Sequence, residues 1–212
     1  MDISELREEY RRETLDKETL DTDPMEQFTA WFNQARKAGI KEPNSMILAT
    51  VDPAGQPWTR TVLLKKIDAR GLVFFTNFES RKASHIAANA KVSLLFLWLD
   101  LERQVSINGI AEKISTAESM AYFVSRPLGS RLGAWSSRQS SVITSRSLLE
   151  AKLEEMKRKF SDGKVPLPSF WGGYRILPQS FEFWQGRRSR LHDRFLYSKS
   201  AQDLWQLDRL QP

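Results

Sequence analysis

The spacing of apolar residues divides the chain into a charged N-terminal stretch and a longer patterned region. Residues 1–23 carry apolar side chains too sparsely to fill a core, so we expect an arm that is mobile or that docks on another surface. After Asp23 and Pro24, a favourable helix start, apolar residues recur at helical spacing as far as Ala35. The pattern predicts one helix that ends before Glu42.

Alternating apolar and polar residues, typical of half-buried strands, dominate the rest of the chain. This alternation predicts strands over residues 45–52, 58–67, 72–76, 92–98, 104–113, 173–177, 181–185, 190–197 and 205–210. Helical patterns cover residues 80–89, 115–123 and 145–160. Ser115 and Glu118 open the second of these helices as a capping box.

The order of these elements predicts the fold class. Most of the strands follow one another through short turns, which favours an α+β fold of mainly antiparallel β structure, with a barrel and peripheral helices. The sequence contains no internal repeat, no low-complexity tract and no long linker. Residues 24–212 are therefore expected to form a single domain behind an arm of residues 1–23.

Composition narrows the classes of protein to which the chain can belong. The 212 residues include no cysteine, which excludes disulfides and thiolate chemistry, and two histidines are too few for a histidine-rich metal site. No apolar run approaches the roughly 20 residues that span a bilayer, and the N-terminus has no apolar signal segment. We expect a cytoplasmic protein with no metal and no membrane partner.

The charge balance points to an anionic partner. With 32 basic and 26 acidic residues the net charge is +6, which suits nucleic acid, a membrane surface or a small anion. The basic residues occur in short clusters at the ends of expected strands and form no continuous stripe, which argues against nucleic acid. Small anionic ligands fit this distribution best.

The first basic cluster flanks an expected strand, with Arg60 at one end and Lys65 at the other. These cations either end the strand in solvent or hold an anion above the sheet. The second cluster, Arg81 and Lys82, falls in the first turn of the helix expected from Ser80. Helix N-termini disfavour cations, so the pair is either tolerated at a small cost or balanced there by an anion such as phosphate.

The third cluster lies near the C-terminus. If the chain there is extended, Arg190, His192 and Arg194 share one face. Such a face is retained either as a solvated edge strand or because an anionic or electron-rich ligand compensates it. Gln104 opens another polar strand face, which either contacts a heterocycle edge or faces water. His85, among alanine and isoleucine residues in an expected helix, is expected to be structural.

Several motifs, in order along the chain, make it resemble the pyridoxine/pyridoxamine 5′-phosphate oxidase family. They are RTVLLK (60–65), FTNFESRKASHI (75–86), LERQVSINGIAEK (101–113), SRP (125–127), WSSRQSS (135–141), PLPSFWGGYRI (166–176), EFWQG (182–186) and RLHDRFLY (190–197). The resemblance runs from about residue 5 to the C-terminus, and PLPSFWGG and RLHDRF are its most specific parts. It implies a split-barrel flavoprotein, acting as a homodimer with flavin mononucleotide (FMN) at the subunit interface.

By matching position, the resemblance also implies roles for individual residues. Its implied FMN ligands are Arg60, Val62, Leu63, Lys65, Phe75, Thr76, Arg81, Lys82, Gln104, Gln139, Ser140, Trp184 and Arg194. Its implied substrate ligands are Lys65, Tyr122, Arg126 and Ser130 at the phosphate, Arg190 and His192 over the ring, and Arg7 and Tyr10 in a closing arm. Arg190 and His192 are also the implied catalytic residues.

The implied reaction oxidises pyridoxine 5′-phosphate or pyridoxamine 5′-phosphate to pyridoxal 5′-phosphate. A hydride passes from C4′ of the substrate to the flavin, and O2 then reoxidises the flavin and yields hydrogen peroxide; the amine substrate also releases ammonia. Two features depart from the family pattern: Phe75, where tyrosine is common, and the basic pair Arg187 and Arg188. Alternative functions are another split-barrel flavin reductase or oxidase, a non-enzymatic flavin or pyridoxal-phosphate carrier, and a nucleic-acid-binding barrel.

Overall fold

The computed structural model describes residues 1, 3, 5, 9–10 and 13–212. Its helices are α1 (Pro24–Lys37), α2 (Arg81–Ala88), α3 (Thr116–Ser125), α4 (Leu128–Ser136) and α5 (Arg146–Lys159), with short 3-10 turns η1 (Lys17–Thr19), η2 (Leu99–Leu101) and η3 (Arg188–Arg190). Its strands are β1 (Ser45–Val51), β2 (Pro57–Leu63), β3 (Lys66–Asp68), β4 (Gly71–Asn77), β5 (Lys91–Trp98), β6 (Arg103–Lys113), β7 (Trp171–Gln185), β8 (Asp193–Lys199) and β9 (Trp205–Leu210). None of the helices in this described part is long and apolar enough to cross a membrane.

The strands form one antiparallel sheet whose order requires it to curl. Its main path runs β2-β1-β5-β6-β7-β4-β3, and β8 and β9 extend from the second half of β7. β2 and β3 lie at opposite ends of this path, yet only Leu64 and Lys65 join them in the sequence. The two ends of the sheet must therefore meet at this link, which closes the barrel.

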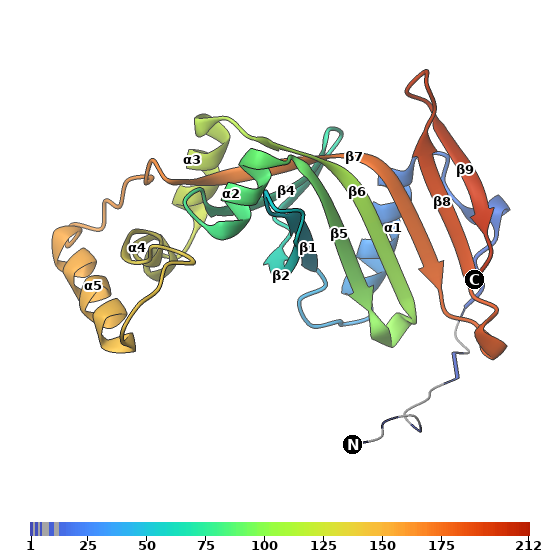
Figure 1. Cartoon of the computed structure of the whole chain (residues 1–212), viewed down its shortest axis with the longest axis horizontal. Helices are drawn as coiled ribbons and strands as arrows, with labels where there is room; N and C mark the ends of the chain where they lie inside the picture. Colours follow the sequence, from blue (N-terminus) through green and yellow to red (C-terminus); the bar gives the residue numbers. More distant parts are fainter. Residues whose placement is uncertain (2, 4, 6–8, 11–12) are drawn as a thin grey trace.

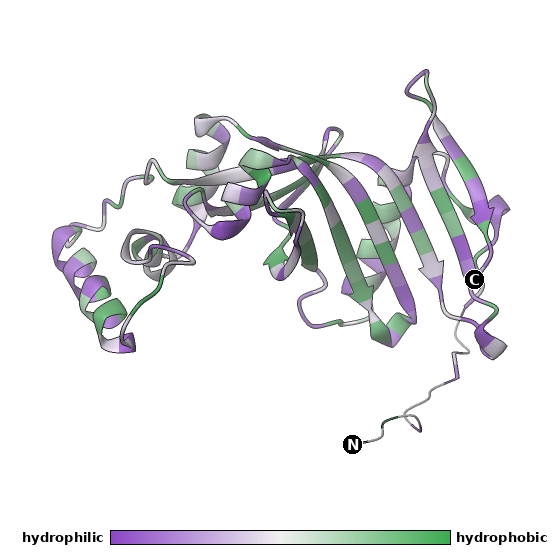
Figure 2. Cartoon of the chain, viewed as in Figure 1, coloured by the Kyte–Doolittle hydropathy of each residue, from purple (hydrophilic) through white to green (hydrophobic). Residues whose placement is uncertain are grey.

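A large aromatic core fills the space between the sheet and helix α1 (Figure 1). Phe28 of α1 lies 4.9 Å from Phe96 of β5, and Trp31 lies 5.2 Å from Phe183 of β7, both between ring centroids. Apolar and polar residues alternate along β6, which buries every second side chain from Arg103 to Ala111 (Figure 2). The expected α+β class with antiparallel strands is confirmed.

Some expected strands have different bounds in the structure. The strand expected over 58–67 breaks at the barrel-closing link, because β2 pairs with β1 whereas β3 pairs with β4. The strands expected over 173–177 and 181–185 are one strand, β7, which continues through Pro178. A register shift between Asn108 and Gly109 of β6 lies opposite this proline, and such irregularities accommodate a residue with no N–H.

The expected extended face of Arg190, His192 and Arg194 is wrong. β8 begins only at Asp193, and Arg190 ends the 3-10 turn η3 with a φ of +61°. Ser189 before it has a φ of +55°. Two successive non-glycine residues in this sparsely populated region are typical of functional sites, where surrounding structure holds such strain.

The described part of the N-terminal arm docks on the chain itself. Leu15 is buried in the main core, and its N–H donates to Asp193 of β8 at 3.1 Å. Tyr197 donates its hydroxyl to the carbonyl of Asp21 at 2.6 Å. From Leu15 onward the arm therefore packs against its own chain, and closure of residues 1–23 over the active site stays a prediction.

Helices α3, α4 and α5 pack at the other end of the molecule from β8 and β9 (Figure 1). A second, smaller core holds them together around Phe123, Leu132, Val165 and Trp171. Of these helices, α4 was missing from the sequence-based elements. It begins after Pro127 without a side-chain cap and contains Gly129 and Gly133, so its local helix signal is weak.

Candidate active site

A cavity of about 490 Å³ lies where the barrel closes against helices α3 and α4. The closing link contributes Lys65, α2 contributes Lys82, and the end of α3 contributes Arg126. No aspartate or glutamate lines this cavity among the described residues. Its size suits a small-molecule ligand, and three cations without a carboxylate favour an anionic one.

One end of the cavity is built around the start of α2. Lys82 is 9% exposed, and its Nζ donates to Gln139 Oε1 at 2.8 Å, Thr76 Oγ1 at 3.0 Å and Ser80 Oγ at 3.2 Å. Ser80 is the N-cap residue, as expected, but its side chain makes no capping hydrogen bond. The backbone N–H of Arg81 donates to Ser140 Oγ at 3.2 Å. The structure therefore brings together, at the expected helix start, five of the implied FMN ligands: Thr76, Arg81, Lys82, Gln139 and Ser140.

Like charges gather at this end, and no carboxylate among the described lining residues balances them. Burial and then the nearby charge of Arg60 lower the pKa of Lys82 to about 8. Burial, followed by the charge of Arg81, lowers the pKa of Arg60. A bound phosphate would relieve this repulsion.

Arg60 and Arg81 lie near this end of the cavity but do not line it. Arg60 donates to the carbonyl of Leu48 at 2.9 Å and to Thr50 Oγ1 at 2.7 Å. The guanidinium carbon of Arg81 lies 4.6 Å from the ring centroid of Trp58. In this structure the two guanidinium groups bind the protein, and they shape the electrostatic field of the site.

The other end of the cavity contains Tyr122, Arg126 and Ser130, which the sequence assigned to a second phosphate. The guanidinium carbon of Arg126 lies 4.7 Å from the Trp171 ring centroid, and its Nη1 is buried without a hydrogen-bond partner in the described structure. Burial lowers the pKa of Arg126, although Tyr122 opposes this effect. A buried N–H without a partner is costly, so Nη1 is available to a ligand.

The cavity walls contain expected residues and some that sequence reasoning missed. Val62, Leu63, Phe75, Thr76 and Gln139 line it as expected. Phenylalanine at position 75 is accommodated by stacking, because its ring lies 3.9 Å from that of Tyr122 and 5.4 Å from that of Trp171. Sequence reasoning missed Thr61, Asn77, Gly133, Ala134, Ser137 and Trp171. Recognition of α4 would have brought Gly133 and Ala134 into the candidate set.

The remaining expected ligands lie apart from the cavity within one chain. Gln104, Trp184, Arg190, His192 and Arg194 are absent from its described lining. Four of them belong to β6, β7, η3 and β8, and His192 lies between η3 and β8. β8 lies at the opposite end of the molecule from α4 (Figure 1). One chain therefore presents two separate halves of the expected site.

His192 is the centre of this second half. Its ring lies 4.6 Å from that of Trp184 and 5.8 Å from that of Tyr10. The backbone N–H of Arg187 donates to His192 Nδ1 at 3.1 Å, which assigns the ring proton to Nε2. Burial and then the charge of Arg190 lower the pKa of His192, so a neutral ring with a donating Nε2–H is favoured.

Of the basic pair Arg187 and Arg188 beside this half, Arg187 has clear partners in the structure. Arg187 Nε lies 3.6 Å from Asp193 Oδ2, and its Nη1 donates to the carbonyl of Glu13 at 3.1 Å. Arg194 donates to Glu182 Oε1 at 2.9 Å, so its charge is paired in the single chain. Tyr10 reaches Trp184 and His192, whereas Arg7 lies outside the described residues.

Known protein families match most of the chain. Residues 32–160 match the family described as pyridoxamine 5′-phosphate oxidase, and residues 171–212 match the pyridoxine 5′-phosphate oxidase C-terminal dimerisation region. A protein of Rippkaea orientalis named pyridoxine/pyridoxamine 5′-phosphate oxidase is 60% identical over 212 residues, covering 100% of both chains. A protein of the same name from Aliarcobacter butzleri is 55% identical, also over 100% of both chains.

Solved structures show the same fold. PhzG from Burkholderia lata 383, in complex with tetrahydrophenazine-1-carboxylic acid, has a TM-score of 0.89 at 28% identity, over 95% of this chain and 99% of that chain. A pyridoxamine 5′-phosphate oxidase-related, FMN-binding protein from Nostoc punctiforme has a TM-score of 0.72 at 18% identity, over 91% and 100%. These neighbours confirm the split barrel. With full-length relatives at up to 60% identity, the chain belongs to the pyridoxine/pyridoxamine 5′-phosphate oxidase family of oxidoreductases.

Proposed function

We propose that this protein is an FMN-dependent oxidase that converts pyridoxine 5′-phosphate or pyridoxamine 5′-phosphate to pyridoxal 5′-phosphate. O2 is the electron acceptor, hydrogen peroxide is a product, and the amine substrate also releases ammonia. One observation carries the proposal: a cavity lined by Lys65, Lys82 and Arg126 has no described carboxylate and has basic groups at both ends. That distribution suits two phosphorylated ligands held side by side.

The residues at the start of α2 fit the phosphate of FMN. Lys82, Thr76, Gln139 and Ser140 already converge there through hydrogen bonds that a phosphate would replace or extend. The positive end of the helix dipole and the charges of Arg60 and Arg81 add to the attraction. Val62, Leu63 and Lys65 would contact the rest of the cofactor along the barrel-closing link.

The residues at the other end fit the phosphate of the substrate. Arg126 offers its unpaired Nη1, and Tyr122, Ser130 and Lys65 line the same region. Charge-assisted hydrogen bonds from a guanidinium to phosphate are among the stronger polar contacts in proteins. This end distinguishes a phosphorylated substrate from the unphosphorylated ligands of other flavoproteins.

The second half of the site, with Gln104, Trp184, Arg190, His192 and Arg194, would come from the partner subunit of a homodimer. Residues 171–212 match a dimerisation region, and four of these five residues lie within it. In a two-fold dimer each chain gives one half to each of two sites. Tyr10 packs on His192, so the arm of residues 1–23 would close the site from the same side.

The protein contributes orientation and electrostatics to the reaction. Bound FMN supplies the redox chemistry by accepting a hydride from C4′ and passing electrons to O2. Arg190 would position C4′ and stabilise charge that develops there, while the Nε2–H of His192 donates a hydrogen bond to the substrate. The stacked walls formed by Phe75, Tyr122 and Trp171 keep water from the ligands. We propose a cytoplasmic location for this activity.

The proposed reaction has a direct spectroscopic test. The purified holoenzyme should show the visible absorption of oxidised flavin, and this absorption should bleach when pyridoxine 5′-phosphate is added without oxygen. Readmitted air should restore the colour and release hydrogen peroxide. Pyridoxine without the phosphate serves as the matched control and should bleach the flavin far less. Bleaching by a reduced nicotinamide but not by either B6 compound would identify a flavin reductase instead.

The lowered pKa of Lys82 predicts how FMN affinity depends on pH. The ordinary lysine value is 10.5, and burial lowers the pKa of Lys82 to about 8 in the flavin-free protein. Between these values the unfolded chain binds more protons, so this group makes the flavin-free fold more stable as pH rises. Because phosphate binds the protonated form, FMN affinity should fall above pH 8 by up to about tenfold per pH unit.

Riboflavin provides the control for this pH series, because it has the same ring system but no phosphate. Fluorescence titrations of the flavin-free protein should show a steep pH dependence for FMN and a shallow one for riboflavin. Lys82→Met should weaken FMN binding below pH 8 and remove most of its slope above it. Equal slopes for the two flavins would place the FMN phosphate elsewhere.

A further inference from the structure

A buried arginine lies beside the candidate active site without taking part in it. Arg175 lies in the first third of β7, opposite Val73 of β4 and Glu112 of β6, and its side chain is 1% exposed. Burial of a guanidinium is costly unless carboxylates pair with it. The carboxylates that pair with Arg175 therefore show which elements of the structure its charge connects.

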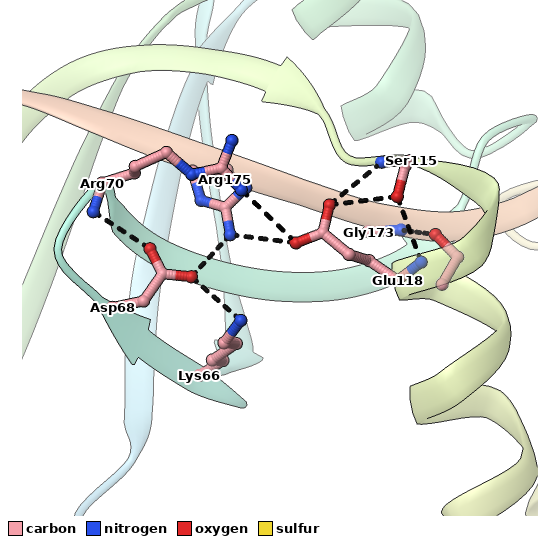
Figure 3. Close-up of polar contacts among 8 residues, drawn as sticks. Lys66, Asp68, Arg70, Ser115, Glu118, Gly173 and Arg175 are labelled. Atoms are coloured by element: carbon pink, nitrogen blue, oxygen red, sulfur yellow. Dashed lines mark hydrogen bonds and ion pairs between the residues drawn. The ribbon is translucent and has the colours of Figure 1, made fainter.

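Arg175 bridges two elements of the structure (Figure 3). Its Nη2 donates to Asp68 Oδ2 of β3 at 2.6 Å and to Glu118 Oε1 of α3 at 3.2 Å. Lys66 Nζ lies 3.1 Å from the same Asp68 oxygen, and Ser115 donates to Glu118 through both its N–H and its hydroxyl. The guanidinium of Arg175 thus joins β3 to the first turn of α3.

Both carboxylates in this network are charged. Burial raises the pKa of Asp68, but hydrogen bonds from Arg175 and Lys66 outweigh it and lower the pKa to about 2. The hydrogen bond from Arg175 also lowers the pKa of Glu118. The bridge is therefore an ionic one throughout the physiological pH range.

Both carboxylates of the bridge lie close in the sequence to side chains that are proposed to bind phosphate. Lys65 immediately precedes β3, and Tyr122 follows Glu118 by one turn of α3, whose C-cap is Arg126. These three residues line the main cavity. A smaller cavity of about 240 Å³ is lined by Lys65, Lys66, Glu118 and Tyr122 together, so the network and the site share a wall. Arg175 itself lines neither cavity.

We propose that Arg175 is a positioning residue that sets, through Asp68 and Glu118, the distance between Lys65 and the pair Tyr122 and Arg126. A phosphate that takes donors from two separate elements requires those elements to be held within a fraction of an ångström. Arg175 therefore determines how tightly the site binds the phosphate of its substrate. This inference rests on the proposed function, which assigns these three side chains to that phosphate.

The test measures binding instead of turnover. The probe is 4-deoxypyridoxine 5′-phosphate, in which C4′ is a methyl group. It has no alcohol or amine at C4′, so it is not oxidised to the aldehyde by loss of a hydride. By calorimetric titration of the FMN-loaded protein, Arg175→Met should raise the Kd of this probe by about tenfold, which corresponds to about 1.4 kcal/mol of binding free energy. The Kd of unphosphorylated 4-deoxypyridoxine should stay near its wild-type value. A general loss of structure would weaken both ligands alike.

Two further variants separate positioning from stability. Ile107→Ala removes a fully buried core side chain that lines neither cavity, so it should lower Tm while the Kd for the phosphorylated probe is retained. Arg175→Lys keeps the charge but not the planar fork, and should give an intermediate Kd. A Kd for Arg175→Lys that lies between those of the wild type and of Arg175→Met would support a positioning role for Arg175.

Glu118→Gln is the alternative variant if Arg175→Met does not fold, because its amide oxygen can still accept hydrogen bonds from the N–H and the hydroxyl of Ser115. It should weaken binding of the phosphorylated probe to a smaller extent, without affecting the unphosphorylated one. An unchanged Kd in Arg175→Met, or in Glu118→Gln if the former is unfolded, overturns the positioning role alone. A wild-type protein that binds neither probe overturns the proposed function and the positioning role with it.

Discussion

Replacement of Arg126 by alanine should raise the KM for pyridoxine 5′-phosphate by about ten- to a hundredfold while FMN stays bound. The guanidinium packs against Trp171, and its buried Nη1 has no partner in the described structure. A hydrogen bond to a charged group contributes about 1.5–3 kcal/mol, and each 1.4 kcal/mol is a factor of ten in affinity. Steady-state kinetics and the flavin absorbance of the same preparation give both quantities.

Arg146→Ala is the matched control for Arg126. It makes the same substitution at an arginine on α5 that is 88% exposed and pairs only with Glu150 in the described structure. Its KM should equal that of the wild type. Loss of FMN from Arg126→Ala, with an unchanged KM in any residual holoenzyme, would show that this end of the cavity binds the cofactor.

Replacement of Arg190 by alanine should lower kcat by about a hundredfold, comparable to the loss of one donor that stabilises a transition state. FMN affinity should change little, because the residues proposed for the FMN phosphate belong to the other half of the site. Arg190 lies in a strained turn beside the neutral ring of His192, a geometry suited to a group that touches the reacting carbon. Stopped-flow measurement of anaerobic flavin reduction isolates this step.

Arg188→Ala tests whether the effect belongs to Arg190 or to positive charge in general. Arg188 is exposed in the same 3-10 turn, and its loss should leave flavin reduction nearly unchanged. An Arg190→Ala protein that reduces its flavin at the wild-type rate would remove Arg190 from the catalytic step.

Hybrid dimers extend this test to the shared site. If Arg126 and Arg190 serve one site from different subunits, a dimer of one Arg126→Ala chain and one Arg190→Ala chain has both arginines in one site and neither in the other. Such a hybrid should recover activity that neither parent dimer has. A hybrid as inactive as its parents would indicate that both arginines act from the same chain.

Local signals in the sequence were sufficient for most elements. Asp23, Ser115 and Ser145 all cap helices through their side chains, as their residue types favour. Apolar alternation also located β1, β5, β6 and the edge strand β9 to within a few residues. These features depend on neighbours in the sequence, which is why the sequence alone reveals them.

The failures of sequence reasoning arise where distant parts of the chain decide the structure. The break at Leu64 and Lys65 depends on pairing of β2 and β3 at opposite ends of the sheet. Continuation of β7 through Pro178 depends on the irregularity in β6 that faces it. The positive φ of Arg190 has no local signal, because the residue is neither glycine nor asparagine.

The candidate site shows the same division. The helix start at Ser80 and its cations were predictable from capping and dipole arguments, and the structure places Lys82 in the cavity with Thr76 and Gln139. The role of Arg175 was not predictable, because its partners Asp68 and Glu118 are 107 and 57 residues away in the sequence. Residues that act through others carry no motif of their own.

If FMN binds in this cavity as proposed, the link between β2 and β3 would make the supply of the cofactor a determinant of how much folded protein accumulates. Lys65 reaches the cavity only when the two outermost strands of the sheet have come together, so an open chain lacks a complete binding surface. A ligand that binds the closed form alone stabilises it by RT ln(1 + [L]/Kd). Cells short of riboflavin should therefore degrade this protein faster than cells replete with the vitamin.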